Sequence, residues 1–399
     1  MTGASDDDPS GIATYSQAGA QFGLSTLWTA LLTTPLMISI QEMCARIAIV
    51  THEGLAGVIK KNYSKKVLYL IVLITFSAVI LNIGADISAI GAVSNLLVPQ
   101  ISAVFFSIMF TIILALALIK FKYRRIASIL KWLCLALLAY FVVPFLIKEN
   151  WQKVLTSTLI PSIQFNSSFL LILVALLGTT ISPYLFFWQA SSEAEERRHS
   201  KKEFMVNKKV IRDMRFDVDI GMLFSNIVMF FIILTAGTVL FSAGITNITT
   251  VQQAAIALKP LAGNASYLLF ALGVIGAGLL AIPVLAGSLS YIYAEILDSK
   301  EGLDMKFNQA RGFYLVLLIA LGIGLLINFI GISPITMLIY SAVLYGLIAP
   351  ILILLILHIS NNRKILDQFV NSKLSNALGI ITFIVMAVAA ILYLYLLLV

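Results

Sequence analysis

The sequence predicts an all-α integral membrane protein whose helices form an inverted five-plus-five repeat, with about 11 transmembrane segments. Three observations predict it: an apolar composition, a series of membrane-length segments, and a pair of proline interruptions at corresponding positions in two halves of the chain. Of the 399 residues, 60% are hydrophobic and 12% are charged. An ordinary globular domain carries about 25% charged residues, so the composition indicates a protein that lies in the bilayer.

The membrane-length segments are identified by their size, because about 20 helical residues cross about 30 Å of hydrocarbon. Ten of them run near 24–50, 67–96, 101–119, 126–147, 168–190, 218–243, 265–288, 312–330, 334–358 and 376–398. Residues 12–22 are too few for a full span. We interpret them as the second half of a broken helix whose first half is missing, so the first segment is truncated at its N-terminus. We expect no signal peptide, since no basic start precedes an apolar core.

Two prolines interrupt segments that should cross the membrane. Pro9 lies in "DDDPSG" and Pro183 in "GTTISPYLF", each after small or hydroxyl residues and before apolar ones. Proline removes an amide donor and clashes with the preceding turn, so both segments should unwind there. Unwound backbone at membrane depth is tolerated where it lines a cavity. A pair of such interruptions in corresponding positions indicates the binding site of a transporter.

The two interruptions define the internal repeat. Each is followed by four further spans, so the first repeat covers about 1–147 and the second about 168–358, with an extra helix at about 376–398. Because five is odd, the second repeat enters the membrane from the opposite side, which is a leucine-transporter-like fold. We therefore expect one transmembrane transporter domain over residues 1–399.

The basic residues predict the orientation in the cell membrane. When the connections are assigned to alternate sides, all but three of the 27 Lys and Arg residues fall on one side, and that side is cytoplasmic by the positive-inside rule. The cytoplasmic loops are then 51–66, 120–125, 191–216, 296–311 and 359–375. Because the basic residues are spread over short loops and form no single patch, nucleic-acid binding is not expected. The oligomeric state stays open, and a monomer is plausible.

Three consecutive carboxylates adjoin the first interruption. Unwound carbonyls and half-helix C-termini coordinate cations, and Asp8 adds a full negative charge. A divalent cation therefore fits this position. Acids also cap helices, but one cap does not require three of them, so we favour metal binding for Asp8. For Asp6 and Asp7, capping, metal binding and a solvated lining that concentrates cations all stay open.

These residues carry a resemblance. "DPSGIATYSQAGAQFG" and the segment after it resemble the first two helices of the Nramp divalent-metal transporter family, whose hallmark is Asp-Pro-Gly-Asn followed by Gln-Ala-Gly-Ala-Gln-Phe-Gly. The resemblance implies that Asp8 is the metal-binding aspartate, that Ser5 offers a carbonyl, and that Gly11 stands where the family has an asparagine ligand. In the sixth helix, Ser182 stands where the family has a methionine ligand, and Thr179 lends another carbonyl.

The departures from the family's pattern determine the predicted substrate. A methionine thioether is a soft ligand that prefers transition metals, and Ser182 replaces it with a hard oxygen. Gly11 lacks the amide and enlarges the site. A roomier site built of oxygen suits Mg²⁺, which keeps part of its water shell. The chain is thus most similar to the Nramp-related magnesium transporter branch, and Mn²⁺ should also enter because it accepts oxygen ligands.

Proton coupling is predicted to be weak or absent. The resemblance implies that ordinary members use a third-helix Asp-x-x-Glu pair and a sixth-helix histidine. Here Asp86 keeps the acid, Ala89 has lost the glutamate, and Tyr184 replaces the histidine. Asp86 is either a remnant proton or water site or a hydrogen-bonding partner of polar neighbours. Gln21, on the half-helix after Pro9, either lines or gates the path or makes interhelical hydrogen bonds.

Three other functions stay in view. The first is a proton-coupled Mn²⁺/Fe²⁺ symporter of the ordinary Nramp type. The second is an organic-solute symporter on the same fold, which the three acids disfavour because a substrate carboxylate seeks exposed amide donors. The third is a membrane-embedded protease, which would need a second acid facing Asp86 from another span. We predict no enzymatic activity and no cofactor besides the transported ion.

Overall fold

The computed structural model describes residues 8–130, 132–147, 149–199 and 206–398, and every regular element in these ranges is helical. The side chains of residues 124, 134, 197 and 199 are not described. Ser5, Asp6 and Asp7 lie outside the described residues. The all-α prediction is confirmed over the described part of the chain.

The long helices correspond to the predicted spans. They are α2 (Trp28–Thr51), α4 (Lys65–Leu97), α5 (Ala103–Lys120), α9 (Ser167–Thr180) with α10 (Pro183–His199), α11 (Lys208–Val239), α14 (Ser266–Ile296), α15 (Arg311–Ile327), α16 (Pro334–Ser360) and α18 (Lys373–Leu398). The shorter helices are α1 (Pro9–Phe22), α3 (Leu55–Asn62), α6 (Tyr123–Leu130), α7 (Leu138–Leu146), α8 (Trp151–Leu159), α12 (Val251–Ala255), α13 (Lys259–Ala262) and α17 (Arg363–Leu366).

Nine helical segments of the described residues are long and apolar enough to cross a membrane. They match all of the predicted full spans except 24–50, where α2 has 24 residues but also carries Gln41, Glu42 and Arg46. The span over 126–147 was expected to be one helix and is divided among α6, a 3₁₀ turn at Leu133–Leu137, and α7. Hydropathy does not detect such a division, because 3₁₀ and α turns place the same apolar side chains in the bilayer.

The segment 191–216, expected to hold the solvated end of the sixth helix and a cytoplasmic loop, is largely helical, and the sidedness of the loop stays a prediction. α10 continues to His199 and α11 begins at Lys208, so much of this segment is helical. Charged side chains are solvated on a helix that projects from the bilayer as well as in a loop. The charge pattern therefore gave no information on where the helices end.

The interruption before Pro183 lies where it was predicted, whereas at Pro9 the structure describes only the start of a helix, since residues 1–7 lie outside the described part. α1 begins at Pro9 after an extended Asp8, and α9 ends at Thr180, with Ile181 and Ser182 between it and Pro183, which opens α10. Ile181 leaves the helical region, with φ −108° and ψ 66°. Proline alone does not cause the break, because Pro35 and Pro283 lie inside continuous helices. At Pro183 the hydroxyl residues Thr179, Thr180 and Ser182 bond to backbone carbonyls or to α1, which offers the unwound segment alternative partners.

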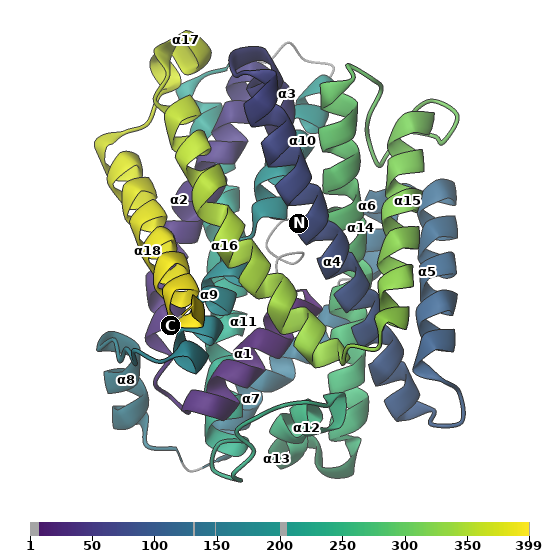
Figure 1. The fold of residues 1–399 in the computed structure, drawn as a ribbon, viewed down its shortest axis with the longest axis vertical. Helices are drawn as coiled ribbons and strands as arrows, with labels where there is room; N and C mark the ends of the chain where they lie inside the picture. The colour runs from purple at the N-terminus through teal and green to yellow at the C-terminus, as the bar shows by residue number, and fades with distance from the viewer. Residues whose placement is uncertain (1–7, 131, 148, 200–205, 399) are drawn as a thin grey trace.

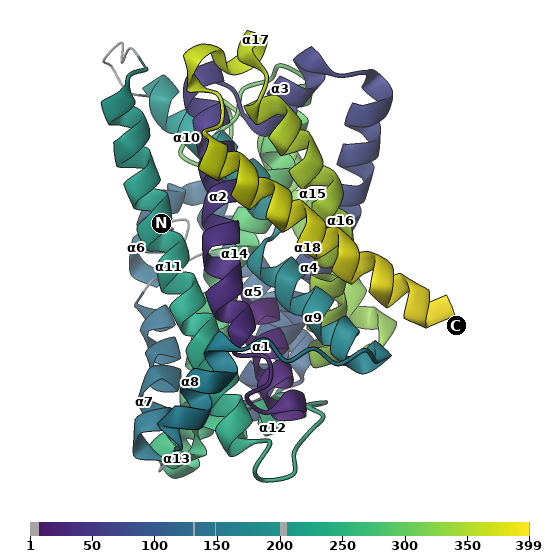
Figure 2. The same cartoon turned by 90° about the vertical axis from the view of Figure 1, so that its left-hand side faces the viewer.

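The half-helix α1 lies inside the bundle. It packs against α9, α11 and α16, while α4 packs against α5, α14, α15 and α16. Figure 1 shows α1 running across the lower half of the molecule, with α5 and α15 at one edge and α18 at the other; Figure 2 shows the same bundle from its left side. The interruption of α9 and the start of α1 therefore meet within the bundle.

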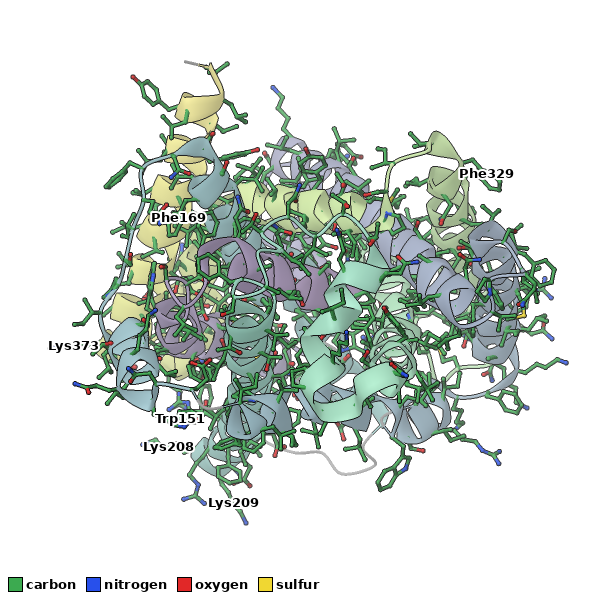
Figure 3. All side chains as sticks on the ribbon, turned by 90° about the horizontal axis from the view of Figure 1, so that it is seen from below. Trp151, Phe169, Lys208, Lys209, Phe329 and Lys373 are labelled. Carbon is green, nitrogen blue, oxygen red and sulfur yellow. The ribbon has the colours of Figure 1, made fainter. Side chains whose placement is uncertain are left out.

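The two ends of the bundle differ in their connections. α3 and α17 lie at one end, and α12 and α13 at the other (Figure 1). The periphery is apolar. Phe329, for example, is 60% exposed and projects from the edge of the molecule (Figure 3). Such exposure is unfavourable in water and expected in lipid.

Two glycines bring α9 and α16 into backbone contact. A Cβ atom at Gly178 would lie 2.1 Å from the Ala342 carbonyl oxygen, and one at Gly346 would lie 2.3 Å from the Val174 carbonyl oxygen. Small residues allow transmembrane helices to approach this closely. The close contact holds the C-terminal end of α9, where the interruption lies, against α16.

We predict that Gly346→Ala separates α9 from α16 and lowers the free energy of unfolding by about 1–3 kcal/mol, the usual cost of overpacking. Thermal melting of the detergent-purified protein measures this. Gly322→Ala is the matched control, because a Cβ atom at Gly322 meets no atom within 4 Å. Equal melting temperatures for the two variants would contradict the assigned contact.

Candidate functional site

Asp8 is the buried carboxylate at the start of α1. It is 1% exposed, and its backbone is extended, so its side chain caps the helix. Its Oδ1 accepts hydrogen bonds from the Gly11 amide at 2.8 Å and from the Ser10 hydroxyl at 2.7 Å. Its Oδ2 accepts one from the Asn82 Nδ2 at 2.8 Å. Because each carboxylate oxygen has two acceptor positions, Oδ2 keeps one of them that no described residue occupies.

The start of α1 contacts the end of α9 through hydroxyl groups. The Ser10 and Thr179 hydroxyls are 3.2 Å apart, and the Tyr15 and Thr180 hydroxyls are also 3.2 Å apart. Gly11 faces the same junction, since a Cβ atom there would lie 3.5 Å from both Asp8 Oδ1 and Thr179 Oγ1. Three of the residues predicted for the site, Asp8, Gly11 and Thr179, are thus brought together.

Ser182 lies in the interruption and is 1% exposed. Its hydroxyl donates within its own segment, to the carbonyl oxygens of Thr179 at 2.5 Å and Gly178 at 3.2 Å. The Thr179 carbonyl, which was predicted to be a ligand, therefore already accepts one hydrogen bond. Both groups keep lone pairs, and the C-terminal carbonyls of α9 carry the partial negative charge of a helix end.

Asn82 was missed by the sequence analysis. It lies on α4, is completely buried, and donates to Asp8, while its Oδ1 accepts a hydrogen bond from the Ser341 hydroxyl of α16 at 2.7 Å. An amide inside the apolar segment 67–96 was the available signal, since intramembrane polar groups mark functional sites. Its partner could not be identified, because Asp8 lies 74 residues away.

Asp86 lies on α4, one turn beyond Asn82. It is completely buried, and neither carboxylate oxygen accepts a hydrogen bond from a described residue. The reading in which Asp86 only bonds to polar neighbours is therefore unsupported by the described contacts. The Tyr345 hydroxyl, on α16, is likewise buried without a described hydrogen-bond partner, and its ring lies 5.7 Å from that of Tyr184.

Gln21 lies at the other end of α1, about 20 Å from Asp8 along the helix at 1.5 Å per residue. Its Oε1 accepts a hydrogen bond from Gln17, whose amide also bonds to the backbone of Thr246 and Ile248. The described bond of Gln21 thus lies within α1, and neither alternative for Gln21 is decided; the contacts that leave α1 are those of Gln17 with Thr246 and Ile248. They tie the end of α1 to the segment that precedes α12.

The ligand atoms that this junction offers to a cation are mainly oxygens. Among the described residues no group of three His, Cys, Asp or Glu side chains converges on a metal position. A thioether, Met229, lies nearby and contacts the hydroxyls of Thr180 and Thr33, at 3.5 and 4.0 Å. A cation beside Asp8 would therefore depend on one carboxylate together with neutral hydroxyl, carbonyl, amide or water oxygens.

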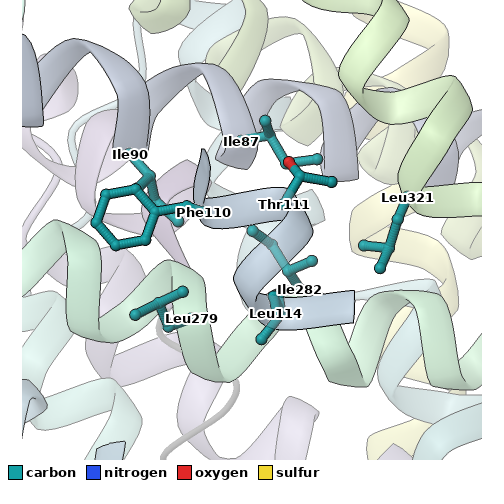
Figure 4. A pocket seen from close by; sticks show the side chains of 8 residues that line it. All are labelled: Ile87, Ile90, Phe110, Thr111, Leu114, Leu279, Ile282 and Leu321. Carbon is teal, nitrogen blue, oxygen red and sulfur yellow. The ribbon is translucent and has the colours of Figure 1, made fainter. Parts of the chain in front are cut away.

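One cavity of the described structure is a packing defect. It lies among α4, α5, α14 and α15 and has a volume of about 10 Å³ (Figure 4). Seven of its eight lining side chains are apolar, and the hydroxyl of the other, Thr111, donates to the Ser107 carbonyl. A space this small and apolar holds no ligand.

A polar cleft of about 220 Å³ opens at the α3 end of the bundle. Its walls include Glu295, which accepts hydrogen bonds from the Gly57 amide at 2.9 Å and from the Ser191 hydroxyl at 2.5 Å. Glu301 pairs there with Arg198. Burial raises the pKa of the Glu301 carboxyl, and the Arg198 guanidinium opposes that rise. These contacts join α3, α10 and α14 on this side of the interruption.

An ion pair links α2 to neighbouring segments at the same end. Arg46 contacts both carboxylate oxygens of Glu42, at 2.9 and 3.1 Å, and also donates to the Phe369 carbonyl. Arg215 of α11 reaches Glu42 at 3.1 Å. Arg46 thereby joins α2 to the segment before α18, and Arg215 joins α2 to α11.

The fold and this site define a family. The family model described as "Natural resistance-associated macrophage protein-like", or Nramp, matches residues 1–396. The chain therefore belongs to the Nramp family, as its motifs predicted, and is a multi-pass membrane protein.

Particular relatives agree with this assignment. The chain is 25% identical over 393 residues to the divalent metal cation transporter MntH of Clostridium acetobutylicum, covering 98% of this chain and 88% of that one. It is 24% identical over 396 residues to MntH of Caldanaerobacter subterraneus, covering 97% and 90%.

Among solved structures, the Eremococcus coleocola manganese transporter in complex with an aromatic bis-isothiourea compound matches with a TM-score of 0.81 at 17% identity. The match covers 99% of this chain and 84% of that one. This likeness confirms the predicted membrane fold. The division into repeats at 1–147 and 168–358 stays a prediction.

Proposed function

We propose that this chain transports a divalent metal cation across the cell membrane, with Mg²⁺ as its main substrate and Mn²⁺ also accepted. The observation that carries the proposal is the buried Asp8 carboxylate, placed beside the interruption of α9 and α10 with an acceptor position free on Oδ2. A buried charge needs a partner, and the hydrogen bonds to Asp8 leave its charge uncompensated. A transported dication supplies that compensation.

The preference for Mg²⁺ follows from the donor set. Thr179, Ser182 and the carbonyls at the end of α9 are hard oxygen donors, and Gly11 supplies no side-chain ligand, which suits an ion that retains part of its water shell. The thioether of Met229 contacts Thr180 and Thr33, and no described hydrogen bond joins it to Asp8. Ser5, Asp6 and Asp7 stay proposed as a carbonyl ligand and as the lining of the approach.

Transport is proposed to occur by alternating access. The half-helices that meet at the site, α1 and α9–α10, move with their bundle relative to α4, α5, α14 and α15. The end that carries α3 and α17 faces the cytoplasm, where the basic residues concentrate. The polar cleft beside Glu295 is then on the cytoplasmic side of the site. A membrane potential of 100 mV supplies about 4.6 kcal/mol for the entry of a dication.

A proton-coupled Mn²⁺ or Fe²⁺ symporter is the second candidate. It is favoured by Asp86, whose buried carboxylate accepts no hydrogen bond from a described residue and lies one turn from Asn82 on α4. A carboxyl group in such surroundings is able to carry a proton. Tyr184 stands at the position of a proton-carrying histidine in the family's pattern and cannot replace it at physiological pH, so we place this candidate second.

Asp8→Asn tests whether the buried Asp8 carboxylate binds the transported ion. The substitution keeps the size of the side chain and removes its charge, so Mn²⁺ and Mg²⁺ flux into proteoliposomes should fall by more than about 100-fold, since even the outer-shell partners of a metal contribute 10–100-fold. Gel-filtration elution and the melting temperature check that the variant folds. A folded variant with unchanged flux would remove Asp8 from the site.

Ser182→Met tests the basis of ion selectivity. A thioether at the interruption supplies a soft ligand, so competition between Mg²⁺ and Cd²⁺ or Mn²⁺ should shift toward the softer ions. The measurement is the concentration of Mg²⁺ that halves Mn²⁺ flux, compared with the wild-type protein. If this concentration does not change, Ser182 does not face the ion.

The pH inside liposomes distinguishes the two candidates. If the first candidate is right and transport is not coupled to protons, Mg²⁺ should enter under an imposed negative potential without acidifying the lumen. An encapsulated pH dye reports the pH of the lumen. Acidification in fixed proportion to metal entry, and its loss in Asp86→Asn, would establish the proton-coupled mechanism instead.

A further inference from the structure

We propose that Asn82 is an amide ligand and positioning residue of the metal site, supplied from α4. In the absence of the ion its NH₂ group holds the Asp8 carboxylate, and in its presence the carboxamide turns so that Oδ1 faces the ion or a water bound to it. This inference rests on the proposed function, because it assumes that a dication binds at Asp8.

The position of Asn82 is the first support. Its Nδ2 lies 2.8 Å from Asp8 Oδ2, the oxygen that keeps a free acceptor position. Oδ1 already accepts two hydrogen bonds, so a cation would bind through Oδ2. A ligand on Oδ2 is necessarily a neighbour of the Asn82 carboxamide. Asn82 is completely buried, so water does not compete for this position from the surface.

The hydrogen bonds of Ser341 allow the carboxamide to turn without leaving a group unsatisfied. The Ser341 hydroxyl lies 2.7 Å from Asn82 Oδ1 and 2.8 Å from the Leu338 carbonyl, and its single proton serves one of them at a time. When it donates to Asn82, the Asn82 NH₂ group faces Asp8. When it donates to Leu338, its oxygen can accept from Nδ2, and Oδ1 is then directed toward Asp8 and the ion.

Electrostatics favours the rotated Asn82 carboxamide only when a cation is bound. Two oxygens facing each other, Asn82 Oδ1 and Asp8 Oδ2, repel without a cation and are both attracted to one that lies between them. Amide oxygens are hard ligands suited to Mg²⁺ and Mn²⁺. Gly11 offers no side chain from α1, so the amide at this position comes from α4.

The same contact joins the two parts proposed to move relative to each other. Asp8 caps α1, Asn82 belongs to α4, and Ser341 belongs to α16. When the ion binds, the Asn82 carboxamide thus exchanges its hydrogen-bond partners at the boundary between α1 and α4. We infer that ion binding changes the link between α1 and α4, which couples occupancy of the site to the motion of the bundle.

Calorimetric titration of the full chain in detergent with MnCl₂ and MgCl₂ tests the inference. Asn82→Ala should weaken Mn²⁺ binding by about 10- to 100-fold. Asn226→Ala is the matched control, since Asn226 is also a buried amide that bonds to a hydroxyl, that of Thr33 at 2.8 Å. It should leave the affinity unchanged.

A rescue separates a ligand from a merely structural residue. A Cβ atom at Gly11 would lie 3.5 Å from both Asp8 and Thr179 and 3.2 Å from the Tyr15 ring, so a side chain there would begin beside the Asp8 carboxylate, with a shift of a few tenths of an ångström by Tyr15 to admit the Cβ atom. Gly11→Asn combined with Asn82→Ala should recover most of the lost Mn²⁺ affinity. A double variant that folds and stays as weak as Asn82→Ala would contradict the inference.

If Asn82→Ala does not fold, the isosteric variant Asn82→Asp tests the inference instead. A second carboxylate facing Asp8 should lower the melting temperature without metal and enlarge the stabilisation by Mn²⁺ beyond that of the wild type. A lower melting temperature with no larger Mn²⁺ effect would overturn the inference. If Asn82→Ala binds Mn²⁺ like the wild type while Asp8→Asn does not, Asn82 is not a ligand and the proposed function stands. If the wild-type protein binds neither Mn²⁺ nor Mg²⁺, the inference and the proposed function both fail.

Discussion

The structure depends on one requirement: a carboxylate buried at the start of a half-helix must be stabilised without water. Asp8 meets it through three hydrogen bonds, from Ser10, Gly11 and Asn82, and through the positive end of the α1 dipole. Those donors fix the carboxylate beside the interruption of α9 and α10. They stabilise the charge but do not neutralise it, and this is the physical reason for expecting a cation at the junction.

The surrounding helices keep this junction in place by close packing. Glycines at 178 and 346 bring the backbones of α9 and α16 into contact, and hydroxyls at 10 and 179 join α1 to α9. At the two ends, the attachments differ. Gln17 ties α1 to the segment before α12, whereas Glu295 links α14 to α3 and α10 through hydrogen bonds around a polar cleft. An arrangement with few, discrete polar links between α1 and α4 suits a site that must open to each side in turn.

Much of this arrangement could be predicted from the sequence, because a bilayer imposes strong constraints. Apolar length predicted the spans, and proline after hydroxyl residues predicted the interruption at Pro183. The family resemblance predicted that Asp8, Gly11 and Thr179 belong to one site. Asn82 and Ser341 could not be assigned, because they lie 259 residues apart and only the packing of α4 against α16 brings them together. The helical ends of α10 and α11 escaped prediction for a different reason, since charged residues are solvated in helix and loop alike.

The most direct measurement is anomalous diffraction from crystals of the full chain soaked in MnCl₂. A Mn²⁺ ion bound as proposed gives a peak within roughly 2.0–2.6 Å of an Asp8 carboxylate oxygen, between the start of α1 and the interruption at Ile181–Ser182. A peak confined to the cleft beside Glu295 and Glu301, with none at Asp8, would contradict the assignment of the site.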